Sequence, residues 1–303
     1  MAGSAACESS AAGVAPAWAS GYGLSDEQLA TFDRDGILVV PGALSEEAME
    51  AMRDRATAIA DAWDGKDVSV FETSKEQARD AFFLESGDKV RCFAEQEAVD
   101  SGAALVTGAA GVNKIGHNLH QLEPAFKAVC FSEEVRAIYR SLGFRRPMAA
   151  QSMYIFKNPR IGGEVSPHQD GTFLWTDPQS CVGVWWALAD CTLENGCLWA
   201  VPGSHKAGVE RHFVRNEAGT GTTFEPLEAT RPLTTEGGVP LECTAGSLVI
   251  IHGAVVHWSA PNRSDTPRPA FSLHVVEGDG VEWPSSNWLQ RPPSDPIPPL
   301  FEE

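Results

Sequence analysis

Apolar positions in the first part of the chain recur at the spacing of α-helices. The clearest helix is predicted within residues 44–65, and a shorter one within 24–36, where Ser25 and Gln28 form a capping-box pattern. A third helix is expected over residues 124–143. The residues expected to pack inward from the clearest helix are Met49, Met52, Ala56, Ile59, Ala60 and Trp63.

The pattern changes near position 147. Short segments rich in β-branched and aromatic residues follow, separated by turns that contain glycine, proline, asparagine or aspartate. This pattern is typical of a sandwich or barrel of antiparallel strands. We therefore predict one domain over residues 23–303, with a helical N-terminal part at 23–146 and a β core at 147–280. Residues 1–22 are expected to form a flexible tail.

Composition and charge disfavour several classes of partner. The formal net charge is −18, from 23 basic and 41 acidic residues, which disfavours binding to nucleic acid or to anionic membranes. No apolar run approaches the roughly 18 residues that a membrane span needs. The seven cysteines show no CxxC spacing, and the N-terminus does not resemble a signal peptide. We therefore expect reduced thiols and a cytoplasmic protein with a small-molecule substrate, whereas the sequence indicates no oligomeric state.

The segment "SPHQDGTF" at residues 166–173 carries the first candidate chemistry. In an extended chain His168 and Asp170 point to the same side, and Gln169 points away. A neutral imidazole and a carboxylate are two adjacent ligands for a divalent metal, but a His-x-Asp triplet often arises by chance. A third ligand is therefore required, and the downstream candidates are His205, His212, His252, His257 and His274.

His257 is the preferred third ligand. It closes an apolar strand predicted over residues 248–256, and Arg268 opens the next strand 11 residues later, so that a hairpin would place the two side by side. His252 lies five residues before His257 and is expected to face the opposite way. Two histidines and one carboxylate leave three positions of an octahedral metal open for a 2-oxo acid and dioxygen. A guanidinium such as that of Arg268 would hold the distant carboxylate of 2-oxoglutarate.

These segments together resemble the phytanoyl-CoA dioxygenase family of Fe(II)/2-oxoglutarate oxygenases, and within it most closely the phytanoyl-CoA dioxygenase domain-containing protein 1 group. The resemblance covers roughly residues 25–290. It implies a mainly β, α+β fold, namely a double-stranded β-helix (jelly roll) with flanking α-helices. The segments that carry it are 82–93, 113–120, 168–170, 192–205, 248–257 and 262–274.

The resemblance also implies cofactors, residue roles and an activity. Fe(II), 2-oxoglutarate and dioxygen would together hydroxylate a small lipid-like or acyl substrate and release succinate and CO₂. Trp185 is preferred to its neighbour Trp186 because Gly183 and Ala187 then share its face and leave room. The residues implied for iron are His168, Asp170 and His257, and those implied for 2-oxoglutarate are Arg268, Lys114, Met153 and Trp185.

Other interpretations stay open from the residues themselves. The same three ligands could hold Zn²⁺ in a hydrolase, or the chain could be a 2-oxoglutarate-binding sensor with little turnover. His117 and His120 would share a face of a helix, either as a second metal site or as hydrogen-bonded neighbours of the cavity. A CoA ester would need compensating positive charge, for which the candidate cluster is Lys89, Arg91, Arg145 and Arg146.

Overall fold

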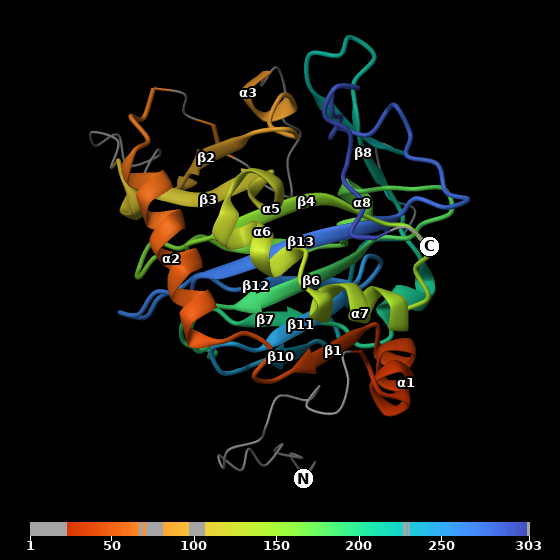
Figure 1. The fold of residues 1–303 in the computed structure, drawn as a ribbon, viewed down its shortest axis with the longest axis horizontal. Coiled ribbons are helices and arrows are strands. Elements are labelled where there is room, and N and C mark those ends of the chain that lie inside the picture. Colours follow the sequence, from red (N-terminus) through yellow and green to blue (C-terminus); the bar gives the residue numbers. More distant parts are fainter. Residues whose placement is uncertain are drawn as a thin grey trace.

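Two antiparallel β-sheets form the centre of the protein (Figure 1). The computed structural model describes residues 23–66, 69–70, 81–96, 107–226, 229 and 231–301, so the predicted tail at 1–22 lies outside the described residues. In spatial order, the larger sheet contains β1 (Ile37–Val40), β11 (Leu248–His252), β6 (Val182–Ala187), β13 (Ala270–Glu277), β4 (Pro147–Ile155), β3 (Val112–His117) and β2 (Val90–Ala94). The smaller sheet contains β10 (Val239–Leu241), β7 (Leu198–Ala200), β12 (His257–Ser259) and β5 (Val165–His168), and a separate pair is formed by β8 (His212–Arg215) and β9 (Thr222–Glu225).

Eight of these strands form a double-stranded β-helix. Along the chain β4, β6, β11 and β13 enter the larger sheet, whereas β5, β7, β10 and β12 enter the smaller one. The chain therefore crosses repeatedly between the sheets, which gives the jelly-roll connection. The predicted fold class is confirmed.

Helices cover the outer face of the larger sheet, as Figure 1 shows for α2, α6 and α7. Val184 and Trp186 of β6 point into this helical layer, whereas Trp185 and Ala187 point between the sheets. The Tyr139 hydroxyl of α7 donates to the Val182 carbonyl of β6 over 3.0 Å and fixes the helix on the sheet. The helices are α1 (Asp26–Asp35), α2 (Glu46–Asp61), α3 (Ala81–Leu84), α5 (Leu119–Leu122), α6 (Pro124–Cys130), α7 (Glu133–Ser141) and α8 (Asp170–Phe173).

The larger sheet extends across the predicted boundary between a helical part and a β core. The strand β1 pairs with β11, and β2 and β3 extend the sheet beyond β4, so that three strands come from residues before position 147. The predicted capping box is present at the start of α1, where the Ser25 hydroxyl accepts a hydrogen bond from the backbone amide of Gln28. Within the described ranges, no helix combines the length and apolar character needed to cross a bilayer.

Two predicted elements are each divided in the structure. The helix expected over residues 124–143 is two helices, because Ser132 leaves the helical conformation and its hydroxyl caps α7 by accepting from the Val135 amide. The strand expected over residues 248–256 ends at His252. A turn at Gly253 follows, where a Cβ atom would lie 2.6 Å from the Cys181 carbonyl oxygen. The chain then continues as β12 in the other sheet.

The paired histidines His117 and His120 lie on different elements, the end of β3 and the helix α5. Both side chains are fully buried, and each Nδ1 atom lies near a serine hydroxyl, Ser86 at 2.7 Å and Ser152 at 2.8 Å. Neither belongs to the three-residue metal group found among the described residues. Burial lowers the pKa of both imidazoles to about 3. They are therefore neutral, hydrogen-bonded core residues at neutral pH.

The cap at Ser132 gives a first prediction. Substitution of Ser132 by alanine removes the acceptor for an orphan amide of α7 and should lower the free energy of unfolding by about 1 kcal/mol. Ser132→Asp, which retains a capping oxygen, should stay near the wild-type value. Urea unfolding followed by circular dichroism measures both, and equal stability of the alanine variant and wild type would contradict the assignment.

The buried imidazole of His120 gives a second prediction. Its folded pKa of about 3 lies below the unfolded value of about 6.5, so the unfolded chain binds more protons between these pH values. The free energy of unfolding therefore falls as the pH drops below about 6.5. In His120→Gln this contribution disappears. As the pH falls, the free energy of unfolding of wild type should therefore decrease relative to that of the variant, by at most about 1.4 kcal/mol per pH unit. Urea unfolding from pH 7 to 4.5 measures this difference. If the free energies of unfolding of wild type and His120→Gln changed in parallel with pH, the prediction would be wrong.

Candidate metal centre

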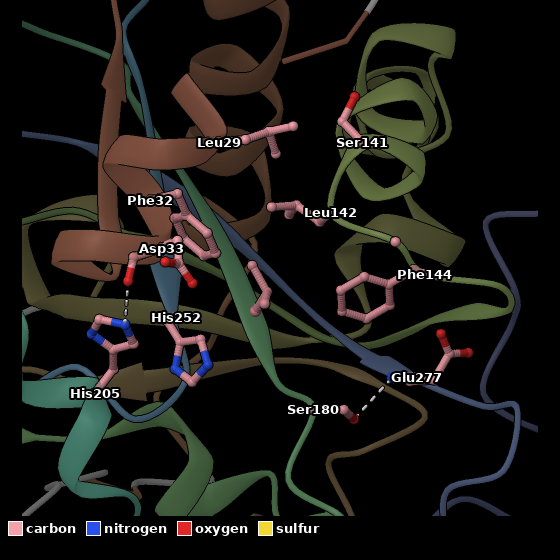
Figure 2. A pocket seen from close by; sticks show the side chains of 12 residues that line it. Leu29, Phe32, Asp33, Ser141, Leu142, Phe144, Ser180, His205, His252 and Glu277 are labelled. Carbon is pink, nitrogen blue, oxygen red and sulfur yellow. Dashed lines mark hydrogen bonds between the residues drawn. The ribbon is translucent and has the colours of Figure 1, made fainter. Parts of the chain in front are cut away.

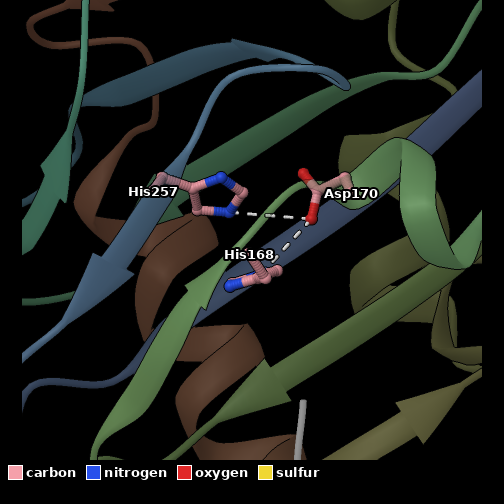
Figure 3. Close-up of side chains that lie close together, drawn as sticks. All are labelled: His168, Asp170 and His257. Atoms are coloured by element: carbon pink, nitrogen blue, oxygen red, sulfur yellow. Dashed lines mark ion pairs between the residues drawn. The ribbon is translucent and has the colours of Figure 1, made fainter. Parts of the chain in front are cut away.

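Three side chains, His168, Asp170 and His257, lie close together, as Figure 3 shows. His168 is the last residue of β5, Asp170 is the first of α8, and His257 is the first of β12. The strands β5 and β12 are neighbours, and His168 lies opposite His257 in their register. One ligand atom from each of the three residues lies within 4.8 Å of the others. Segments almost 90 residues apart in sequence thus supply one cluster.

The carboxylate of Asp170 lies between the two imidazoles. Its Oδ1 atom is 3.6 Å from Nε2 of His168 and 3.6 Å from Nε2 of His257, and the two ring centroids are 4.2 Å apart. The three side chains are 13%, 9% and 8% exposed in the order His168, Asp170, His257. The cluster is thus almost closed to solvent. Among the described residues, it is the group of histidine and acidic side chains that could hold a metal ion.

Backbone contacts determine which nitrogen of each histidine is free. Nδ1 of His168 lies 2.8 Å from the Ser166 carbonyl oxygen, and Nδ1 of His257 lies 3.1 Å from that of Val255. A carbonyl oxygen can only accept, so each Nδ1 carries the proton. The unprotonated Nε2 atoms therefore face Asp170, as metal-ligating histidines require.

The charge states also suit a divalent metal. Burial alone raises the pKa of Asp170, but the neighbouring His274 and His257 imidazoles outweigh burial and hold this pKa well below its usual range. Burial and, to a lesser extent, the adjacent His168 together lower the pKa of His257 to about 4. At neutral pH His257 is a neutral donor and Asp170 an anionic one. Such a nitrogen and oxygen donor set accommodates iron or zinc.

Gln169, between the candidate ligands His168 and Asp170, anchors this segment to its surroundings. The Gln169 amide points away from the cluster, as expected, and donates to the carbonyl oxygens of Gly208 at 2.8 Å and Ala254 at 2.6 Å. The Gly171 amide donates to the Gly253 carbonyl oxygen at 2.7 Å. These bonds tie the His-Gln-Asp segment to the turn that leads into His257.

A cavity adjoins the cluster between the sheets. Lys114 of β3, Met153 of β4, Trp185 of β6 and Arg268 all line it, together with the three candidate ligands. The structure therefore brings every sequence-predicted site residue to one cavity. Trp186 points to the opposite side of the sheet. Apolar walls of the cavity include Ile155, Val165, Leu198, Ile251 and Trp258.

Arg268 is a buried cation with open hydrogen-bond donors. Its side chain is 1% exposed, and its Nε and Nη1 atoms have no hydrogen-bond partner among the described residues. The guanidinium carbon lies 5.3 Å from the centroid of the Trp185 ring. Leaving a buried charge unpaired is costly, so this arrangement is suited to a bound anion.

The route that brings Arg268 to the cluster differs from the predicted hairpin. His257 begins β12 in the smaller sheet, whereas Arg268 precedes β13 in the larger sheet. The hairpin prediction is wrong because the connecting turn crosses from one sheet to the other. The two residues instead line the same cavity from different sheets.

The sequence indicated His274 only as a possible third metal ligand and did not indicate Ser272 or Lys157 in this region. His274 and Ser272 of β13 line the cavity, and strand alternation starting from Arg268 would have found both. Lys157 follows β4 and is fully buried, and its Nζ atom donates to the Gly163 carbonyl at 2.6 Å and the Ser259 hydroxyl at 2.9 Å. Burial lowers its pKa to about 6. Its left-handed conformation, with φ of 45°, has no signal in the sequence.

The other candidate histidines lie elsewhere. Figure 2 shows His205 and His252 in a separate cleft beside α1 and the end of α7, with ring centroids 5.0 Å apart. His252 therefore faces away from the cluster, as predicted. His212 stacks on Trp175 with ring centroids 3.8 Å apart. None of the three belongs to the candidate metal centre.

Known proteins are similar to this chain in sequence and in fold. The family model described as Phytanoyl-CoA dioxygenase (PhyH) matches residues 32–270. "Phytanoyl-CoA dioxygenase 1" of Oryza sativa subsp. japonica is 46% identical over 281 residues, covering 92% of this chain and 98% of that protein. "Phytanoyl-CoA dioxygenase domain-containing protein 1" of Bos taurus is 46% identical over 289 residues, covering 92% and 99%.

Solved structures show the same fold at low identity. The non-heme alpha ketoglutarate dependent epimerase SnoN from nogalamycin biosynthesis has a TM-score of 0.61 at 17% identity, covering 91% of this chain and 92% of its own. EctD from S. alaskensis, solved with 2-oxoglutarate and 5-hydroxyectoine, has a TM-score of 0.58 at 18% identity, covering 86% and 78%. With the family model spanning most of its length and relatives at 46% identity, the chain belongs to the phytanoyl-CoA dioxygenase family.

Proposed function

We propose that this protein is an Fe(II)- and 2-oxoglutarate-dependent dioxygenase that hydroxylates a small lipid-like or acyl substrate and releases succinate and CO₂. The observation that carries the proposal is the buried, open guanidinium of Arg268 in the cavity that also contains the His-Asp-His cluster. A metal site alone would not need this cation. A dicarboxylate that binds the metal at one end needs it at the other.

The cluster fits Fe(II). Two neutral imidazoles and one carboxylate, all supplied from one side, are the donor set of non-haem Fe(II) oxygenases and leave positions open for a co-substrate. His168, Asp170 and His257 would hold the ion through two Nε2 atoms and a carboxylate oxygen. The Nδ1 contacts of both histidines keep the rings oriented for it.

The cavity fits 2-oxoglutarate. Arg268 would bind the carboxylate distant from the metal, while Lys114, Met153 and Trp185 form the walls between. The buried Ser272 hydroxyl has no hydrogen-bond partner among the described residues and offers a further polar contact. A known relative in fold, SnoN, was solved in complex with Fe³⁺ and alpha ketoglutarate, which supports the assignment.

Bound Fe(II) and 2-oxoglutarate would supply the oxidising chemistry with dioxygen, whereas the chain supplies binding, orientation and exclusion of water. Leu198 and Ile251 make the cavity wall apolar and keep bulk solvent from the reacting atoms. The Gln169 contacts hold the ligand segment in place, and Arg268 orients the co-substrate. A zinc hydrolase would use the same three ligands but has no role for Arg268.

The ion pairs on the surface favour a substrate without the phosphates of CoA. Three residues of the basic cluster considered for a CoA ester have acidic partners. Lys89 lies 3.0 Å from Asp88, and Arg91 lies 3.8 Å from Glu85. Arg145 likewise lies 3.1 Å from Asp279. We therefore propose a free acid or a neutral lipid-like molecule as the substrate class.

Turnover of 2-oxoglutarate provides the main test. Anaerobically purified protein is given Fe(II), 2-oxoglutarate and then air, and succinate is measured. Wild type should form succinate, His257→Ala should lose it, and Arg268→Ala should regain it only at high 2-oxoglutarate. His252→Ala, altered in the separate cleft, should behave as wild type. If wild type forms no succinate, fails to bind 2-oxoglutarate and retains zinc tightly, the hydrolase interpretation replaces this proposal.

The bidentate role of Arg268 can be measured without turnover. Lysine keeps the positive charge in Arg268→Lys but cannot present two parallel donors, so 2-oxoglutarate should bind about 10- to 150-fold more weakly, from about 1.5–3 kcal/mol for a charged hydrogen bond. Equilibrium dialysis with Mn(II) in place of iron measures the dissociation constant. Arg160→Lys, at an exposed ion pair with Asp265, is the matched control. If wild type, Arg268→Lys and Arg160→Lys bound 2-oxoglutarate with equal dissociation constants, the role of Arg268 would be contradicted.

A further inference from the structure

The two oxygen atoms of Asp170 have different neighbours. Oδ1 faces the Nε2 atoms of His168 and His257, each at 3.6 Å. Oδ2 instead lies 3.3 Å from Nε2 of His274, a residue of β13 whose side chain is 6% exposed. His274 lies outside the group of three candidate ligands and approaches the carboxylate at the other oxygen.

The proton on His274 can be placed from its neighbours. A carboxylate oxygen can only accept, so Nε2 of His274 must carry the hydrogen in a contact with Asp170. Its Nδ1 atom is buried and has no hydrogen-bond partner among the described residues. His274 therefore has the opposite tautomer to His168 and His257, whose Nδ1 atoms donate to backbone carbonyls. Its nitrogen facing the site is a donor and not a metal ligand.

The neighbouring strand leaves room for this contact. Gly183 of β6 lies opposite His274 in the sheet register. A Cβ atom at Gly183 would lie 3.2 Å from Cδ2 of His274 and 3.3 Å from Oδ2 of Asp170. Both distances are tighter than ordinary packing, so a side chain here would press on the imidazole and the carboxylate together.

We propose that His274 is a positioning residue that holds Asp170 through Oδ2, so that the carboxylate presents only Oδ1 to the metal, with Gly183 providing the space. The inference rests on the proposed metal site and extends it. A carboxylate released from His274 can rotate and offer both oxygens, which would occupy a position that the co-substrate or dioxygen needs. Loss of such an outer contact to a metal ligand typically weakens metal affinity or activity about 10- to 100-fold.

Metal binding tests the proposal without turnover. Co(II) is titrated into metal-free wild type, His274→Leu and His274→Gln, and both the dissociation constant and the visible absorption of the bound ion are recorded. In His274→Leu the dissociation constant should rise about 10- to 100-fold and the spectrum should change. Glutamine places an N–H donor near the position of Nε2, so His274→Gln should restore most of the affinity. His252→Leu, at a histidine outside the centre, should bind as wild type.

The outcomes separate this inference from the proposed function. Wild-type affinity in His274→Leu overturns the positioning role, and so does an equal loss in the leucine and glutamine variants, which would indicate packing alone. If His274→Leu does not fold, Gly183→Ala takes its place, and unchanged Co(II) affinity and spectrum there would overturn the proposal. Failure of wild type to form succinate would count against the dioxygenase function and leave the Co(II) comparison valid.

Discussion

The pairing of two short strands, β5 and β12, is the constraint on which the site depends. It places His168 opposite His257, although each strand contributes only four or three residues. Because side chains alternate along a strand, a slip by one residue would turn one histidine away from the cavity. Short strands hold a register weakly by themselves. Here the bonds from Gln169 to Ala254 and from Gly171 to Gly253 pin the two segments beside the ligands.

The space between the sheets contains several buried ionisable side chains. Asp170, Arg268 and Lys157 are each less than 10% exposed, and Lys114 lines the same cavity. Burying charges is costly, so such a layer does not stabilise the fold by itself. The largest apolar cluster of the described residues lies on the other face of the larger sheet, where Met52 of α2 and Phe126 of α6 belong to the same cluster as Trp186 of β6. Burial of each such side chain contributes about 1.5–3 kcal/mol. This cluster and the candidate site thus lie on opposite faces of one sheet.

The sequence by itself determined the elements and motifs that depend on near neighbours. The capping box at Ser25 and Gln28 follows from a spacing of three residues, and the His-x-Asp spacing marked His168 and Asp170 as two side chains that meet in one cluster. Such spacings fix geometry because the local backbone periodicity is constant. The resemblance to a known family added predicted roles for distant residues such as Lys114, which lines the cavity. It did not show that the helix near Ser132 would be divided, because both halves continue the same apolar pattern.

Only the tertiary structure decided which distant segments meet. At the break, only a glycine at position 253 leaves room for the close approach of the Cys181 carbonyl, a contact between segments distant in sequence. The crossing between sheets that carries the chain from His257 to Arg268, and the contact of His274 with Asp170, both depend on the order of strands in the sheets. Strand order is set by packing of the whole chain and has no counterpart in spacing along it. The sequence therefore indicated which residues could bind a metal, whereas the fold decided how their surroundings hold them.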